Sequence, residues 1–168
     1  AILQHSRSVP IVMAFVGDDP VAAGLARSLS RPGGSVTGLT NQTTELDRKH
    51  MELLNEAVPT ARRIAILAIP PPRHVDSVRE MKRVAVTLGL EAQEVFGSEA
   101  ADYDAAFARM RNFGAEALAI ASAPEFSRDA KILARHALEG RLPTIGETAS
   151  MVHDGCLIGY GPDRIAFR

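Results

Sequence analysis

The sequence contains little of what usually marks a specialised class of protein. It has one cysteine, Cys156, and therefore cannot form an internal disulfide. Its formal net charge is −1 over 168 residues, which gives no general attraction to nucleic acid or to an anionic membrane surface. No run approaches the roughly 18 uninterrupted apolar residues of a membrane-spanning helix. These features argue against a disulfide-stabilised scaffold, a basic nucleic-acid binder and a helical membrane protein.

Metal and catalytic motifs are also missing. The five histidines show no metal-ligand spacing, and we find no GxSxG elbow, P-loop, HExxH motif or GxGxxG run after a strand. One cysteine cannot supply the two opposing thiols of an amino-acid racemase. We therefore expect no metal, no cofactor and no enzymatic activity, and we interpret His50, His74 and His136 as solvated residues of helices.

Short apolar runs alternate with segments of helical period along the whole chain. The run from Val9 to Val16 is typical of a strand buried on both faces. Strands separated by helices of ten or more residues imply right-handed parallel crossovers, with helices on both faces of the sheet. The sequence thus predicts an α/β fold. The expected strands are 9–16, 36–39, 63–69, 90–96, 115–121, 142–145 and 155–160.

Two predicted helices can be placed by their first turns. The first helix would begin with Asp19 as its N-cap and Pro20 at its first position, and end near Ser30. The second would begin with a capping-box-like pair, Thr44 and Asp47, and stop before residue 59. Its apolar stripe predicts a surface helix over a sheet; the stripe consists of Leu46, Leu53, Leu54 and Ala57. Further helices are expected around 78–88, 103–110 and 132–137.

Ligands of parallel α/β sheets bind beyond the carboxyl ends of the strands, so polar residues at those ends are candidate ligand contacts. Asp18 and Asp19 follow the first strand. Asp19 as an N-cap already occupies the positive end of its helix, which disfavours a bare anion as ligand. Asp18 could pair with the ammonium group of a zwitterion. The alternative is that both aspartates serve only the turn and the cap.

The other candidates follow later strands, and each has a purely structural alternative. Thr40 and Asn41 can donate and accept hydrogen bonds but also form turns. Ser122 and Glu125 lie in a loop where Ser127 or its neighbours could cap a helix. Glu147 could receive a positive group or act as a first-turn acid. Between two glycines, Tyr160 offers a stacking surface or packs at a chain crossing.

Four segments in a fixed order carry a family resemblance. They are PIVMAFVGDDPVAAGLARSLSRPGGSVTGLTN, ELDRKHMELLNEAVPTARRIAIL, LPTIG and GCLIGYGPD. Together they resemble the ABC transporter substrate-binding protein family that includes binders of tryptophan and other aromatic amino acids. The resemblance covers nearly the whole chain. One departure is the turn GDDPV, where the family has GDPV, and this leaves open which aspartate faces the ligand.

The resemblance implies a type I periplasmic-binding fold, in which two three-layer α/β lobes with parallel sheets close on a ligand. It implies a partial, incomplete first lobe at 1–40, a second lobe at 41–146, and a return to the first lobe with a last crossing at 147–168. It also implies that the turn at Asp19, Thr40 with Asn41, the loop 122–125 and Tyr160 line the cleft. An incomplete lobe leaves sheet edges uncovered, so we expect a homo-oligomer.

The function implied by this resemblance is capture of a small solute, an amino acid or similar zwitterion, for an ABC importer. The expected partner is the transporter permease, and the expected location is periplasmic or otherwise extracytoplasmic, although residues 1–10 lack the regions of a signal peptide. Two alternatives remain. One is a ligand-sensing module of a regulator, for which no DNA-binding head is visible, and the other is a flavodoxin-like enzyme.

Overall fold

The structure, a computed structural model, describes residues 9–16, 20–21, 23–40, 43–71 and 75–162. The chain forms two compact units, residues 1–44 (unit 1) and residues 45–168 (unit 2). Strands in both units pair in parallel, which confirms the predicted α/β class. No helix among the described residues is long and apolar enough to cross a membrane.

Unit 1 contains two paired strands, β1 (Ile11–Val16) and β2 (Val36–Thr40). They run in parallel with a register shift near Met13, which lies opposite Gly38. A Cβ atom on Gly38 would overlap the backbone of Met13, and Gly38 has a φ of +144° that other residues rarely adopt. The close approach of the two strands therefore requires glycine at this position.

The helix predicted to run from Asp19 to Ser30 is wrong for the part of it that the structure describes. Residues 20–21 and 23–30 form turns and bends. The backbone N–H of Leu25 donates to the carbonyl of Pro20 at 2.8 Å, which is not the i to i−4 pattern of an α-helix. Gly24 then adopts a left-handed φ of +68°, which ends any helical turn.

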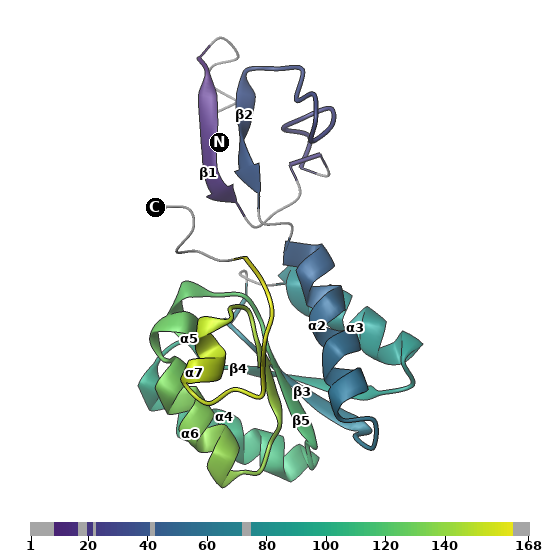
Figure 1. Ribbon diagram of the computed structural model, residues 1–168, viewed down its shortest axis with the longest axis vertical. Helices are drawn as coiled ribbons and strands as arrows, with labels where there is room; N and C mark the ends of the chain where they lie inside the picture. Colours follow the sequence, from purple (N-terminus) through teal and green to yellow (C-terminus); the bar gives the residue numbers. More distant parts are fainter. Residues whose placement is uncertain (1–8, 17–19, 22, 41–42, 72–74, 163–168) are drawn as a thin grey trace. The chain divides into compact units, whose positions relative to one another are not determined.

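Unit 2 is built on one five-stranded parallel sheet with the order β4-β3-β5-β6-β7. Its strands are β3 (Arg63–Ala68), β4 (Glu91–Phe96), β5 (Ala117–Ile120), β6 (Thr144–Gly146) and β7 (Ile158–Gly159). Its helices are α2 (Thr43–Ala57), α3 (Val75–Thr87), α4 (Ala100–Phe113), α5 (Pro124–Arg128), α6 (Ala130–Glu139) and α7 (Ser150–His153). Figure 1 shows α2 and α3 on one side of the sheet and α4, α5 and α6 on the other.

The central strands of this sheet feed two hydrophobic cores, because successive side chains of a strand point to opposite faces. In β3, Ile64 and Ile66 pack into the core under α2 and α3. Leu67, the next residue, packs into the core under α4 and α6. β5 alternates in the same way, with Leu118 and Ile120 on the α4 side. Burial on both faces explains why these strands are continuous apolar runs in the sequence.

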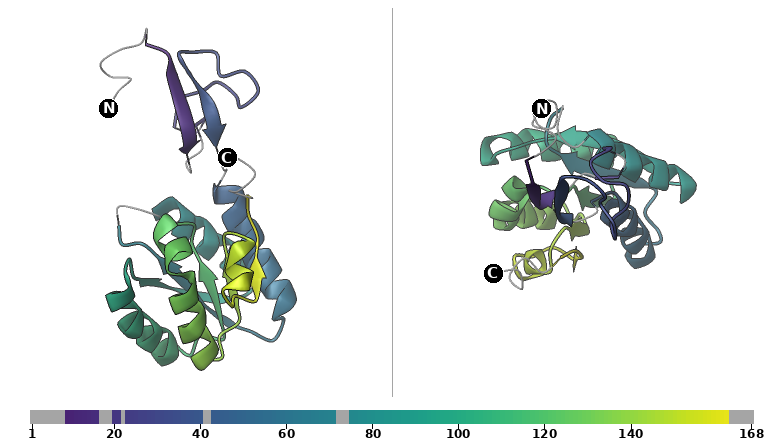
Figure 2. Two further views of the ribbon diagram at one scale, coloured as in Figure 1. Left: turned by 60° about the vertical axis from the view of Figure 1, so that its left-hand side comes forward. Right: turned by 90° about the horizontal axis from the view of Figure 1, so that it is seen from above.

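The last described segment stays with unit 2. Strand β7 pairs with β6, so that Ile158 lies opposite Ile145 and Gly159 opposite Gly146. The family resemblance assigns 147–168 to a segment that returns to the first lobe, whereas β7 adds a strand to the sheet of unit 2. Figures 1 and 2 both show the segment with β7 running beside α2.

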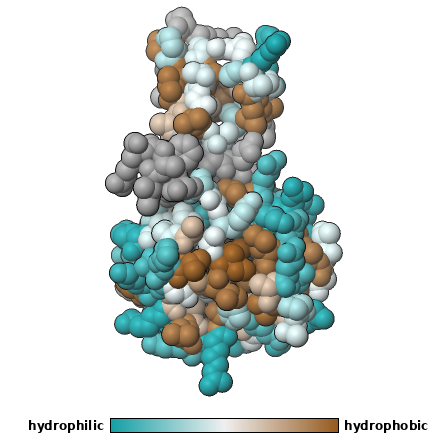
Figure 3. All heavy atoms as spheres, viewed as in Figure 1, coloured by the Kyte–Doolittle hydropathy of each residue, from teal (hydrophilic) through white to brown (hydrophobic). Residues whose placement is uncertain are grey.

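The face of unit 2 in this region is apolar. Figure 3 shows an apolar area between more polar flanks on the face turned to the viewer. Leu157, directly before β7, is exposed, and Leu53 and Ile158 are only partly buried against the core beneath. The edge of the sheet at β7 thus carries apolar surface that no described element covers.

Candidate functional site

Two of the predicted contact residues meet at the carboxyl ends of β5 and β6. Ser122 follows β5 and Glu147 follows β6, and the Ser122 hydroxyl donates a hydrogen bond to Glu147 Oε2. The Ser127 hydroxyl donates to the other carboxylate oxygen, Oε1, at 2.7 Å. Glu147 is 2% exposed. The result is a buried carboxylate whose two oxygens are each oriented by a serine.

Ser127 reaches this carboxylate because of α5, a five-residue helix that the sequence analysis did not predict. Pro124 stands in its first turn, where the missing N–H costs nothing. Phe126 is fully buried and anchors the helix on the sheet. Ser127, a possible cap from its position in the sequence, lies inside α5 and donates its hydroxyl proton to Glu147.

Tyr160 follows β7 and is held through its backbone. Its N–H donates to the carbonyl of Gly146 at 3.0 Å, and its own carbonyl oxygen lies 2.5 Å from His50 Nε2. The His50 and Tyr160 rings make an edge-on contact, with centroids 6.2 Å apart. Tyr160 is 43% exposed, so part of its surface is available to a ligand.

His50 is fully buried, so its interpretation as a solvated helix residue is wrong.

The buried face of α2 also differs from the predicted apolar stripe. Asp47, His50, Met51 and Leu54 are the buried residues of the helix, while Leu53 is partly buried and Ala57 exposed. Positions 47, 50, 51 and 54 follow the helical period, so two polar residues occupy the buried face.

Asp47 is the most unusual group of this region. It is fully buried, and neither of its carboxylate oxygens has a hydrogen-bond partner among the described residues, so the capping-box role predicted for it is wrong. Burial raises its pKa to about 7; the nearby Ser77 hydroxyl opposes the rise, and the negative charges of Glu80 and Glu147 add to it.

Burial acts on the neighbouring histidine in the opposite direction. The pKa of His50 is lowered by burial, while the Tyr160 carbonyl and the charge of Glu147 act against that change. In the part of the chain that the structure describes, His50 Nδ1 has no hydrogen-bond partner. A proton is therefore held more tightly on Asp47 and less tightly on His50 than in water.

Of the remaining predicted contacts, the structure describes Glu125 and Thr40. Glu125 lies half-buried in the first turn of α5. Thr40 ends β2 in unit 1 and is half-buried. Asp18, Asp19 and Asn41 lie outside the described residues, so the choice between the two aspartates stays a prediction.

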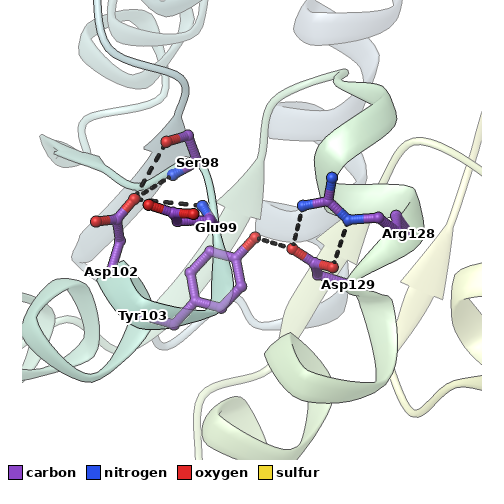
Figure 4. A network of polar contacts seen from close by, with 6 residues as sticks. All are labelled: Ser98, Glu99, Asp102, Tyr103, Arg128 and Asp129. Carbon is purple, nitrogen blue, oxygen red and sulfur yellow. Dashed lines mark hydrogen bonds and ion pairs between the residues drawn. The ribbon is translucent and has the colours of Figure 1, made fainter.

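A second polar cluster links α4 to the α5–α6 junction on the other side of the sheet, as Figure 4 shows. The fully buried Tyr103 donates its hydroxyl proton to Asp129 at 2.9 Å. Arg128 pairs with both oxygens of Asp129 at 2.8 Å and holds the pKa of that carboxyl below its usual range. Asp102 accepts the N–H groups of Ser98 and Glu99 before α4. This cluster holds α4 against the α5–α6 junction.

The described residues offer neither a metal-binding cluster nor a reactive thiol. Their His, Cys, Asp and Glu side chains form no group of three that could hold a metal ion. Cys156 is buried, and burial raises the pKa of its thiol, which makes it a poor nucleophile.

Ser122, Glu147 and Tyr160 thus lie at the carboxyl ends of the strands, where α/β sheets bind ligands. The family model described as "ABC transporter substrate binding protein" matches residues 1–166. The chain belongs to this family of substrate-binding proteins. It is 27% identical over 175 residues to a tyrosine-binding protein of Clostridioides difficile, a match that covers 97% of this chain and 46% of that protein.

Solved structures show the same fold for this substrate-binding protein chain. An ABC domain in complex with L-Trp from Streptococcus pneumonia matches with a TM-score of 0.71 and 20% identity, over 92% of this chain and 53% of the other. A conserved domain protein from Vibrio cholerae matches with a TM-score of 0.73 and 24% identity, over 92% and 51%. The chain therefore spans about half the length of the relatives it matches.

Proposed function

We propose that this chain captures an amino acid, or a similar small zwitterion, for an ABC importer and does no chemistry on it. The observation that carries the proposal is the Glu147 carboxylate, fixed by Ser122 and Ser127 at the carboxyl edge of the sheet. A buried negative charge favours a cation far more strongly than an exposed one does. Ser122, which is half-buried, presents the polar contact, and Glu147 behind it supplies the charge for the ligand's ammonium group.

Tyr160 provides the apolar part of the proposed site. Tyr160, which is partly exposed, comes directly after β7 at the same edge of the sheet. An aromatic ring there can pack against the aromatic or aliphatic side chain of a ligand. Relatives support this ligand class: one is named a tyrosine-binding protein, and two solved structures hold L-Trp and Leu. An amino acid offers both an ammonium group for the charge of Glu147 and a side chain that can pack against Tyr160.

The remaining parts of the proposal rest on the family. They are capture between two lobes, ligand contacts from Asp18 or Asp19, Thr40, Asn41 and Glu125, delivery to the permease, and a location outside the cytoplasm.

Self-association through unit 1 is also part of the proposal. Val12 and Leu39 on its two strands are 73% and 58% exposed, which is apolar surface that a second copy would bury. Light scattering of the chain at tens of micromolar measures this directly, and a monomer would contradict it.

The central test is calorimetric titration of the chain with L-tryptophan, L-tyrosine and L-leucine. Glu147→Gln keeps the size of the side chain and removes its charge. We expect it to weaken binding by about tenfold or more, since hydrogen bonds to charged groups contribute about 1.5–3 kcal/mol. The loss should be much smaller for indole-3-propionate, which is L-tryptophan without its ammonium group.

Glu116→Gln is the matched control. Glu116 also accepts two hydrogen bonds, from the backbone N–H groups of Arg62 and Arg63, but it precedes β5 at the opposite edge of the sheet. Its replacement should leave the dissociation constants unchanged. If Glu147→Gln binds L-tryptophan as tightly as the unchanged chain, Glu147 does not supply the charge that attracts the ammonium group.

A further inference from the structure

Two side chains that lie far apart in the sequence meet beside the proposed ligand site. His50 belongs to the middle of α2, and Tyr160 follows β7, 110 positions later. Figure 1 and the left view of Figure 2 show the segment with β7, drawn in yellow, beside α2. The short contact between His50 Nε2 and the Tyr160 carbonyl ties the two segments together at 2.5 Å.

We propose that His50 is a positioning residue: it holds the backbone of Tyr160 and so sets where the Tyr160 ring meets the ligand. The proposal rests on the proposed function for its ligand part, because Tyr160 is a ligand contact only there. His50 itself is fully buried. It acts through the segment that carries Tyr160.

The chemistry of the contact fixes the histidine tautomer. A carbonyl oxygen only accepts hydrogen bonds, so His50 Nε2 must carry the proton. Nδ1 is then the bare nitrogen of the neutral ring, and it has no partner among the described residues. The whole polar function of this buried ring is therefore its bond to Tyr160. A fully buried histidine with one partner stays in place because that bond offsets part of its desolvation.

The Tyr160 backbone is held from both sides. Opposite His50, the N–H of Tyr160 donates to the Gly146 carbonyl at the end of β6. The segment also lies tightly against the residues after β6, because a Cβ atom on Gly159 or Gly161 would overlap the carbonyl oxygen of Thr148 or Glu147. The β6 side thus limits movement inward, and His50 contacts Tyr160 on the α2 side.

A ligand-free experiment tests the positioning directly. The sequence has two tyrosines and no tryptophan, so Tyr103→Phe leaves Tyr160 as the single fluorophore. In this background we expect His50→Leu, which keeps the bulk and removes the donor, to raise acrylamide quenching of Tyr160 by about twofold. His50→Gln can place an N–H near the position of Nε2 and should restore quenching to within about 20% of the background. His153→Leu, an exposed histidine of α7, is the control and should change nothing.

The ligand part uses calorimetric titration with L-tryptophan and L-leucine. His50→Leu should weaken L-tryptophan binding by about tenfold, the equivalent of one hydrogen bond of about 1.4 kcal/mol, and His50→Gln should recover most of it. L-Leucine, which has no ring to stack on Tyr160, should lose less. Equal losses for both amino acids would overturn the positioning role and leave only a general loss of structure.

The outcomes separate this inference from the proposed function. If the unchanged chain binds neither amino acid, the proposed function fails, while the quenching series still decides whether His50 holds Tyr160. Unchanged quenching in His50→Leu would overturn the inference even if binding is found. Nitrogen NMR of the unchanged chain gives a test without any variant: we expect a protonated Nε2 and a bare Nδ1 on His50, and the opposite tautomer would overturn the proposal.

Discussion

Replacing Asp47 with asparagine should change the pH dependence of stability in a defined way. The folded-state pKa of Asp47 is about 7, against an ordinary value of 3.8. The folded protein therefore binds this proton more tightly than the unfolded chain does. Stability from this group is fully present below pH 3.8, is lost as the pH rises from about 4 to 7, and changes little above that. The charges of Glu80 and Glu147, which face Asp47 from α3 and from the loop after β6, act in the same direction.

The size of the effect follows from the two pKa values. Each pH unit between them lowers the free energy of unfolding by about 1.4 kcal/mol, so the total loss is roughly 4 kcal/mol. Between pH 5 and pH 8 the expected loss is about 2–3 kcal/mol. Asparagine has nearly the same shape and does not ionise. Asp47→Asn should therefore gain about 2–3 kcal/mol relative to the unchanged chain when the pH rises from 5 to 8.

The assay is urea denaturation followed by circular dichroism at pH 5, 6, 7 and 8, for both proteins. The difference between their free energies of unfolding isolates Asp47, because other titrating groups are common to both. Glu56→Gln, an exposed position on the same helix, is the control and should give a constant difference. A constant difference for Asp47→Asn as well would refute the reasoning, since the carboxyl would then be ionised equally in both states.

Three further changes probe the packing around the site by urea denaturation. Tyr103→Phe removes the hydroxyl bonded to Asp129 and should lower the free energy of unfolding by about 1 kcal/mol; no change would mean that the bond adds nothing to stability. In Gly161→Ala, the new Cβ atom would overlap the Glu147 carbonyl. The free energy of unfolding should therefore fall by at least about 1 kcal/mol, and L-tryptophan should bind more weakly. Unchanged binding would contradict this geometry. Phe107→Ala, in the α4 core, should cost about 3–5 kcal/mol, and a loss below about 1 kcal/mol would show that the core collapses around the gap.

The strands were predictable because their signal is local. β3 and β5 are continuous apolar runs, and the structure buries them on both faces. The longer helices α3, α4 and α6 were also located by their apolar stripes. The short helices α5 and α7 were missed, since four or five residues hold too little of a 3.6-residue period to be recognised. The helix after Asp19 was predicted from start and stop signals, and the residues described there form turns and bends rather than an α-helix.

The candidate site was predictable in part. Proximity to strand ends picked out Ser122, Glu147 and Tyr160, because parallel strands bring their carboxyl ends to one edge. It did not pick out His50 or Asp47, which lie in a helix. A signal for them existed: positions 47, 50, 51 and 54 share one helix face. Hydrophobicity alone favours the stripe with more leucines, because two of the four residues on the buried face are polar.

The sequence by itself determined the α/β class, the order of most elements, and a family whose motifs extend along the chain. These features depend on local patterns and on residue order. Only the tertiary structure decided that Ser122 and Ser127 orient Glu147, that α2 turns Asp47 and His50 inward, and that His50 bonds the Tyr160 backbone. The physical reason is that hydrogen bonds and burial depend on which residues meet in space, and the partners here lie 20 to 110 positions apart.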